Sequence, residues 1–118
     1  MKTIITLAFF ALAVTSCNVF GSLTSNTIIK PNDSFVLGNN EHGTFKVKLK
    51  NVSNNDLRIF MAPITGGSHS PIVVSPNKTI IVKAEKNTAL VIENKSNEQA
   101  SVDLYVTGDT GLSMGYKN

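Results

Sequence analysis

The stretch FKVKLKNVSNNDLRIFM, residues 45–61, contains the pattern that decides the fold. Val47 and Leu49 alternate with lysines, so one face of this segment is apolar and the other is cationic, as in a half-buried β-strand. Residues 51–56 are polar and turn-forming, and the alternation of apolar residues resumes over residues 57–61. A strand, a polar loop and a second strand predict a β-hairpin with a longer loop.

The same pattern occurs twice along the chain. Residues 29–37 align with residues 74–82 through a shared Pro-Asn turn, and residues 47–61 align with residues 90–106 through a shared Asn-x-Ser loop. Two similar four-strand halves would produce this repeat. The regular succession of turns and strands in any β-sandwich is the alternative explanation.

An all-β domain is the fold class that these patterns indicate. At 118 residues the chain has room for one domain, and no segment after residue 26 has helical periodicity. We therefore expect a small antiparallel β-sandwich, immunoglobulin-like in the broad sense, over residues 27–118, with a small barrel as the open alternative. The expected core consists of Phe35, Leu37, Phe45, Val47, Leu49, Leu57, Ile59, Met61, Ile80, Val82, Leu90, Ile92, Val102, Leu104 and Val106.

The first sixteen residues have the organisation of a signal peptide. Lys2 is followed by an apolar run from Ile4 to Val14, which is too short to span a bilayer as a helix. The run ends in Val14-Thr15-Ser16-Cys17, which resembles the bacterial lipoprotein signal: an aliphatic residue, two small residues and a cysteine. The resemblance implies cleavage before Cys17 and attachment of a diacylglyceryl group to its thiol.

The lipoprotein resemblance implies an address and no activity. The mature protein would be anchored by lipid to a membrane of the bacterial cell envelope, facing the periplasm or the cell exterior. Residues 17–26 would comprise the lipidated cysteine and a tether, because residues 18–26 are polar and aperiodic; a first edge strand is the alternative. Ordinary signal cleavage after Ala13 is the alternative to lipidation, and it would leave an unpaired thiol at Cys17.

Charge and composition exclude some classes of function. Removal of residues 1–16 takes away one charged side chain, Lys2, and lowers the net charge from +3 to +2. This charge is much weaker than that of a nucleic-acid-binding domain, and an exported protein does not meet nucleic acid. We therefore expect no nucleic-acid partner.

No motif for catalysis or metal binding is present. His42 and His69 are expected in solvent-exposed loops, and no group of ligating residues accompanies either of them. The Gly-x-Ser-x-Gly motif of serine hydrolases is absent. The sequence therefore assigns no catalytic residue, no metal ligand and no cofactor, and we expect a non-enzymatic protein.

The outward-facing residues of the repeated strands form the candidate ligand face. If the apolar residues of segment 45–61 face the core, its lysines and Phe60 face outward, and Tyr105 corresponds to Phe60 in the second copy. Such a face would suit an acidic glycan, anionic lipid headgroups or an acidic patch on a protein; a solvated sheet face is the alternative. The candidate residues are Lys46, Lys48, Lys50, Arg58, Phe60 and Tyr105.

Two functions fit these observations. The first is a membrane-anchored, non-enzymatic interaction or envelope-structural module with a protein or glycan partner in the envelope. The alternative is a glycan-binding module that uses the basic and aromatic sheet face.

Overall fold

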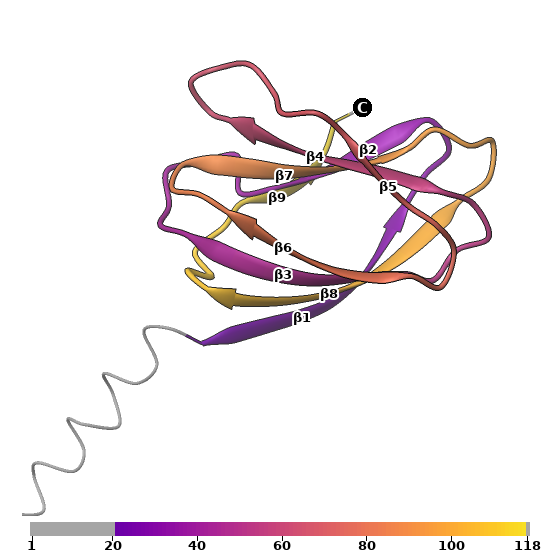
Figure 1. The fold of residues 1–118 in the computed structure, drawn as a ribbon, viewed down its shortest axis with the longest axis horizontal. Helices are drawn as coiled ribbons and strands as arrows, with labels where there is room; N and C mark the ends of the chain where they lie inside the picture. The colour runs from indigo at the N-terminus through magenta and orange to yellow at the C-terminus, as the bar shows by residue number, and fades with distance from the viewer. Residues whose placement is uncertain (1–20, 118) are drawn as a thin grey trace, which may run out of the picture.

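The computed structural model describes residues 21–117, and the signal peptide and Cys17 lie outside the described residues. The described chain consists of strands and loops (Figure 1), and it contains no helix long and apolar enough to cross a membrane. The strands are β1 (Ser22–Ile29), β2 (Asp33–Leu37), β3 (Phe45–Asn51), β4 (Leu57–Pro63), β5 (Ile72–Val74), β6 (Thr79–Ala84), β7 (Thr88–Asn94), β8 (Ala100–Gly108) and β9 (Met114–Tyr116).

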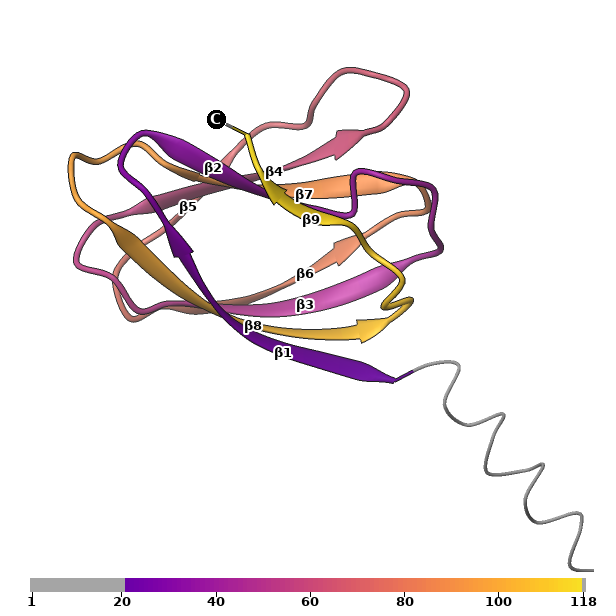
Figure 2. The ribbon, with the colours of Figure 1, turned by 180° about the vertical axis from the view of Figure 1, so that it is seen from behind.

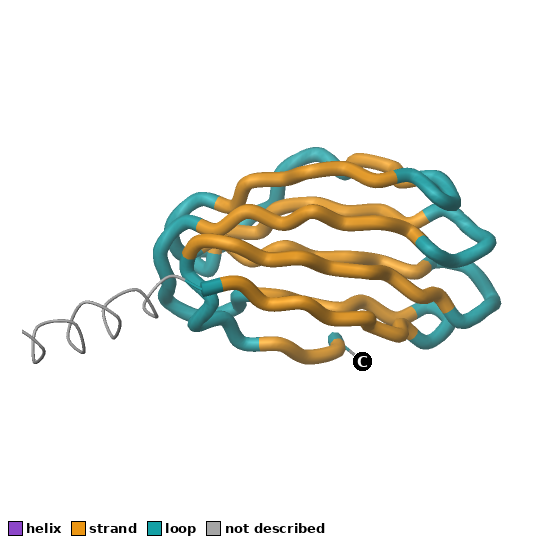
Figure 3. The backbone as a smooth tube through the Cα atoms, turned by 90° about the horizontal axis from the view of Figure 1, so that it is seen from below, coloured by secondary structure: helices purple, strands orange, loops and turns teal. Residues whose placement is uncertain are grey.

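Two antiparallel sheets face each other, and this confirms the predicted all-β sandwich. One is a four-stranded sheet in the order β1-β8-β3-β6, and the other is a five-stranded sheet in the order β5-β4-β7-β2-β9. The two layers are visible from opposite sides (Figures 1 and 2), and the view from below shows the strands side by side with loops at both ends (Figure 3). Strands β1 to β8 alternate between the sheets in sequence order, except where β4 and β5 adjoin in one sheet.

The sequence repeat corresponds to a repeat of the architecture. Exchanging β1–β4 with β5–β8 converts the order β1-β8-β3-β6 into β5-β4-β7-β2, which is the order of the second sheet; β9 extends that sheet. The aligned Pro-Asn turns also adopt the same conformation, because Asn32 and Asn77 have φ angles of 59° and 67°. Asparagine tolerates this left-handed region better than most residues do. The two similar four-strand halves are thus confirmed.

The predicted hairpin over residues 45–61 is wrong. Strand β3 pairs with β6 and β8, whereas β4 pairs with β5 and β7 in the other sheet. The loop between β3 and β4 therefore carries the chain from one sheet to the other. The matching loop between β7 and β8 does the same in the opposite direction.

Two buried asparagines hold these crossing loops. Asn51 is fully buried; its Nδ2 donates to the carbonyl oxygens of Asn55 (2.8 Å) and Val74 (2.9 Å), and its Oδ1 accepts from the amide of Ser53. Asn94 occupies the same place in the other half, and its Nδ2 donates to the carbonyl oxygens of Ile29 and Glu98. Each amide side chain thus supplies the partners that the buried backbone of the corner requires.

The predicted core is largely confirmed. Met61, Ile80 and Val82 are partly buried and pack against the core, and every other predicted core residue is buried. Apart from Val91 in the middle of β7, the buried hydrophobic residues that the alternation does not single out are small or lie at strand ends. They are Ile29, Val74, Ala84, Ala89, Val91 and Ala100.

The expected tether is shorter than the sequence suggested. Strand β1 begins at Ser22 and pairs with β8 from Ser22↔Thr107 to Ile29↔Ala100, so residues 22–26 belong to an edge strand. This part of β1 is polar because it lies at the edge of the sheet and is held by backbone hydrogen bonds more than by burial. The alternative of a first edge strand is the correct one.

Replacing Asn51 by alanine should lower the free energy of unfolding by about 2–4 kcal/mol, because it leaves buried backbone groups without partners. Urea unfolding monitored by circular dichroism measures this change. Asn54→Ala, at an exposed position of the same loop, is the matched control and should change stability by less than about 0.5 kcal/mol. Equal stabilities of the two variants would show that the corner does not depend on the amide.

Candidate ligand-binding face

The outer surface of the four-stranded sheet gathers most of the predicted ligand residues. In the strand register Tyr105 of β8 lies opposite Lys48 of β3, and Asp103 lies opposite Lys50. Lys46 lies opposite Lys83 of β6. We call this surface the lysine–tyrosine face and define it by Lys46, Lys48, Lys50, Lys83, Asp103 and Tyr105.

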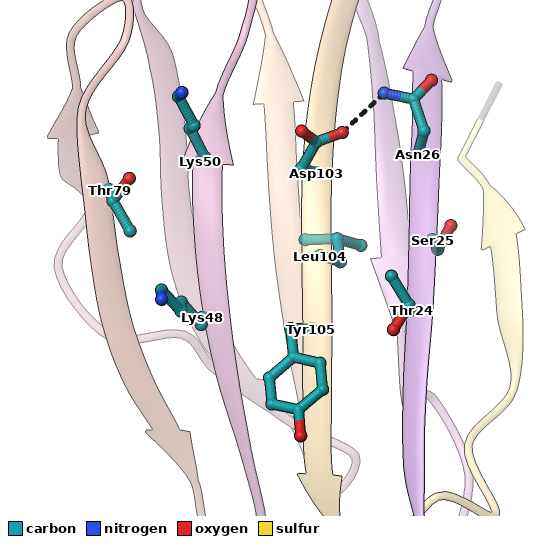
Figure 4. Close-up of a pocket in the computed structure, with 9 residues that line it drawn as sticks. All are labelled: Thr24, Ser25, Asn26, Lys48, Lys50, Thr79, Asp103, Leu104 and Tyr105. Atoms are coloured by element: carbon teal, nitrogen blue, oxygen red, sulfur yellow. Dashed lines mark hydrogen bonds between the residues drawn. The ribbon is translucent and has the colours of Figure 1, made fainter.

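A shallow pocket of about 590 Å³ lies on the lysine–tyrosine face. The Tyr105 side chain projects over the sheet next to β3, and this residue is 45% exposed (Figure 4). Neutral hydrogen-bonding side chains from the edge strands β1 and β6 also line the pocket. The lining residues are Thr24, Ser25, Asn26, Lys48, Lys50, Thr79, Asp103, Leu104 and Tyr105.

The lysine–tyrosine face has an excess of positive charge. All four of its lysines are exposed, and the one ion pair among residues 21–117 joins Arg58 and Glu93 elsewhere. Asp103 forms no ion pair with Lys50, and its Oδ1 accepts a hydrogen bond of 2.7 Å from Asn26 Nδ2 (Figure 4), so one carboxylate stands against four lysines on this face. Lys46 and Lys83 face each other directly, and like charges in this position destabilise a sheet. A bound anion would relieve that repulsion.

The structure divides the predicted face between two surfaces. Lys46, Lys48, Lys50 and Tyr105 lie together, as predicted, but Arg58 and Phe60 belong to β4 in the five-stranded sheet and face outward on the opposite side of the sandwich. The grouping of all six residues is therefore wrong, because it assumed that β3 and β4 form a hairpin. Lys83 was missed because only the pairing of β6 with β3 brings it next to Lys46.

The outer surface of the five-stranded sheet has different chemistry at equivalent positions. Where the first sheet pairs Lys48 with Tyr105, the second pairs Val91 with Phe60. Arg58 and Glu93 form an ion pair there, with 3.8 Å between Nε and Oε1. A second hollow of about 410 Å³ on this side is lined largely by small and apolar residues. The two halves thus share a layout and differ in surface.

The two histidines have different environments. His69 is exposed as expected, but the expectation for His42 is wrong, because it is only 7% exposed. The His42 ring packs edge-on against Phe45 with 5.1 Å between centroids, and its Nε2 lies 3.1 Å from the carbonyl oxygen of Thr88. His42 is therefore a packing residue. Within residues 21–117, no three His, Cys, Asp or Glu side chains are grouped as a metal site requires.

Asp109 is a polar residue with a structural role that the sequence alone did not indicate. Its Oδ2 accepts from the amide of Gly43 (2.7 Å) and its Oδ1 accepts from the amide of Gly111 (2.8 Å). These two hydrogen bonds, with a smaller contribution from nearby His42, lower the pKa of Asp109 below its ordinary value of 3.8. The ionised carboxylate thus joins the loop before β3 to the loop after β8.

The lowered pKa of Asp109 predicts a specific pH dependence. The carboxylate stabilises the folded state above pH 3.8, and this stabilisation is lost as the pH falls through the lowered pKa. Asp109→Asn should therefore lower Tm slightly at neutral pH, and its Tm should approach that of the wild type in stronger acid. Thermal unfolding at several pH values measures this, with Asp56→Asn, at an exposed loop position, as the control. A Tm difference that persists unchanged at pH 2 would contradict it.

Comparison with known proteins identifies the fold. No family model and no curated protein matches the chain. The chain resembles the capsular polysaccharide assembling protein CapF of Staphylococcus aureus, with a TM-score of 0.54, 24% identity, and coverage of 72% of this chain and 22% of CapF. This chain therefore spans less than a quarter of CapF.

Two further structures are similar over more of their own length. An uncharacterised Klebsiella pneumoniae protein with a double-stranded β-helix domain has a TM-score of 0.56 at 10% identity, with coverage of 81% of this chain and 76% of that one. PirA has a TM-score of 0.54 at 16% identity, with coverage of 70% and 92%. At these identities the likeness concerns the fold alone. Together with the strand order, it defines a double-stranded β-helix, or jelly roll.

Proposed function

We propose that this protein is a non-enzymatic binding module of the bacterial cell envelope. It is held at a membrane by a lipid on Cys17, and it presents the lysine–tyrosine face to its ligand. The observation that supports this function best is the exposed Tyr105 ring among lysines that have no ionic partner in the described structure. Tyr105 and the lysines thus offer a ligand an apolar ring and positive charge at the same place.

An acidic glycan is the ligand class that we favour for this face. Sugar rings present C–H groups that pack against an aromatic ring such as Tyr105, and the neighbouring Asn26 and Thr79 offer hydrogen-bonding groups for hydroxyls. Carboxylate or phosphate groups on the glycan would pair with Lys48 and Lys50. The pocket is shallow and open, which suits a polymer lying across the strands better than a small molecule enclosed in a cavity.

The short distance from Cys17 to the sandwich is compatible with display at a membrane. Strand β1 begins at Ser22, so four residues separate it from Cys17. Four extended residues reach at most about 14 Å. A lipid on Cys17 would therefore hold the four-stranded sheet close to the bilayer surface.

Ligand binding is tested with Tyr105→Ala and Lys48→Gln. Each should weaken binding to an acidic polysaccharide by about tenfold, since stacking or ionic contacts of about 1 kcal/mol or more are lost. Isothermal titration calorimetry at two salt concentrations measures the loss, and binding should weaken as salt rises. Phe60→Ala, on the opposite surface, is the control. If acidic and neutral polysaccharides both fail to bind, a glycan is the wrong class of ligand.

The anchor is tested separately, so that its failure does not affect the binding face. Intact-mass analysis of the mature N-terminal peptide should find Cys17 at the N-terminus with the added mass of a diacylglyceryl group. Cys17→Ser should move the protein from the membrane fraction to the soluble fraction. A mature protein that begins at Val14 and carries no lipid would show ordinary secretion instead.

A further inference from the structure

The edge strands on the two long sides of the sandwich have different contacts. On one side, the edge strands β1 and β9 are joined, because the hydroxyl of Tyr116 donates to the carbonyl oxygen of Ile28 (2.7 Å). The Tyr116 ring also packs edge-on against Phe35, with 5.6 Å between centroids. On the other side the edge strands are β5 and β6, and three of their apolar residues are exposed: Ile72 (52%), Val73 (58%) and Ile81 (64%).

Strand β6 directs unpaired backbone groups outward on this open side. The amide of Asn51 donates to the carbonyl oxygen of Lys78, which fixes the alternation of hydrogen-bonded pairs between β3 and β6. In that alternation Ile80 and Val82 bond to β3. Thr79, Ile81 and Lys83 therefore direct their N–H and C=O groups to the free edge of the four-stranded sheet.

We propose that β6 pairs antiparallel with β6 of a second copy of this chain, about a twofold axis at Ile81. In this register Ile81 lies opposite itself, Thr79 lies opposite Lys83, and Ile80 lies opposite Val82. All the outward backbone groups of Thr79, Ile81 and Lys83 find partners within the two strands. A slip of the register would instead pair Thr79 with Glu85 or Lys83 with Asn77, beyond the ends of the strand.

The side chains of β6 favour a second copy of this chain as the partner that pairs with its free edge. Its exposed centre is the β-branched residue Ile81, which packs well against an identical residue across a strand pair. Lys83 would face the neutral Thr79 of the other copy, so no like charges meet within the pair. Ile80 and Val82 are only partly buried and pack against the core, and the added strand would complete their burial.

Strand β6 also has few of the usual features that prevent strand addition. Natural edge strands are protected by charged side chains, especially lysine, by proline, by bulges, by inward charges or by a covering loop, and of these β6 carries Lys83. The sequence of β6 is TIIVKA, which contains one charge and no proline, and its pairing with β3 is regular over the whole strand. The shared interface would be isologous, as in most homodimers.

The pairing has a consequence for the binding module. It would join two four-stranded sheets into one continuous sheet, with both lysine–tyrosine faces on the same side. A polymeric ligand could then contact both faces at once and gain avidity. The pairing itself does not depend on the identity of the ligand, and it is tested without one.

Cysteine cross-linking of the purified full-length protein tests the register. Under mild oxidation Ile81→Cys should form a disulfide-linked dimer, because directly opposed residues in an antiparallel pair lie within the range of a disulfide. Tyr105→Cys, exposed on the same sheet but away from the edge, should not. Thr79→Cys should cross-link to Lys83→Cys when the two variants are mixed, and neither should cross-link efficiently alone. The unsubstituted chain controls for Cys17.

Charge variants at the same position test the pairing without oxidation. Thr79→Lys would place lysines opposite one another twice in the dimer and should raise its dissociation constant about tenfold. Thr79→Glu would place a carboxylate opposite Lys83 twice and should lower the constant. Sedimentation velocity over a concentration series measures both. Within each copy Thr79 also lies opposite Lys50, so Thr79→Lys should lower Tm slightly and Thr79→Glu should raise it slightly, and thermal unfolding measures this effect separately.

Three results would overturn the proposal, two from the variants and one from the wild-type protein. One is an Ile81→Cys protein that cross-links no faster than Tyr105→Cys. The other is equal self-association of Thr79→Lys and Thr79→Glu. If the purified wild-type protein stays monomeric at every concentration, pairing of the chain with itself is wrong, and a strand from a different protein is the remaining candidate for this edge.

Discussion

The buried amides of Asn51 and Asn94 are the interactions on which the architecture depends. Each lies where the chain leaves one sheet and enters the other, about 10 Å away across the core. A backbone that makes this crossing cannot form ladder hydrogen bonds, and its polar groups would be costly to bury without partners. The amide side chains supply donors and an acceptor from a single point. These two corners send β4 and β8 into the sheet opposite to the strand that precedes each of them, and so contribute to which residues share an outer surface.

The sequence predicts those features of the fold and of the candidate face that depend on residues close together in the chain. It does not predict the features that depend on which distant strands become neighbours. The alternation of Val47 and Leu49 with lysines correctly gives the inner and outer faces of β3, since side-chain direction along a strand is a local property. Which strand lies beside β3 is not local, so Phe60 was grouped with Lys48 although a whole core separates the two surfaces. His42 illustrates the same difficulty, because the carbonyl oxygen of Thr88 that faces its ring is distant in sequence. Similarly, Ser22–Asn26 has too few apolar residues to identify it as a strand, and its pairing partner is β8.

The repeat allows equivalent positions in the two halves of the sandwich to be compared. Equivalent cross-strand positions hold Lys48 with Tyr105 in one sheet and Val91 with Phe60 in the other. The core residues around them remain aliphatic in both halves. The buried framework therefore tolerates quite different surfaces, and the positive face is a property of one half and not a requirement of the fold. This conclusion agrees with the low sequence identity between this chain and the solved structures that resemble its fold.

The filled space between the sheets has an evolutionary consequence. Aliphatic and aromatic side chains from both sheets occupy that space, so recognition on the four-stranded sheet falls to its outer surface. Along β3 and β8 the residues that maintain the core and the residues available to a ligand alternate one by one. A substitution at an outward position leaves its buried neighbours in place. Selection can therefore change what this protein recognises in single steps while its stability stays nearly constant.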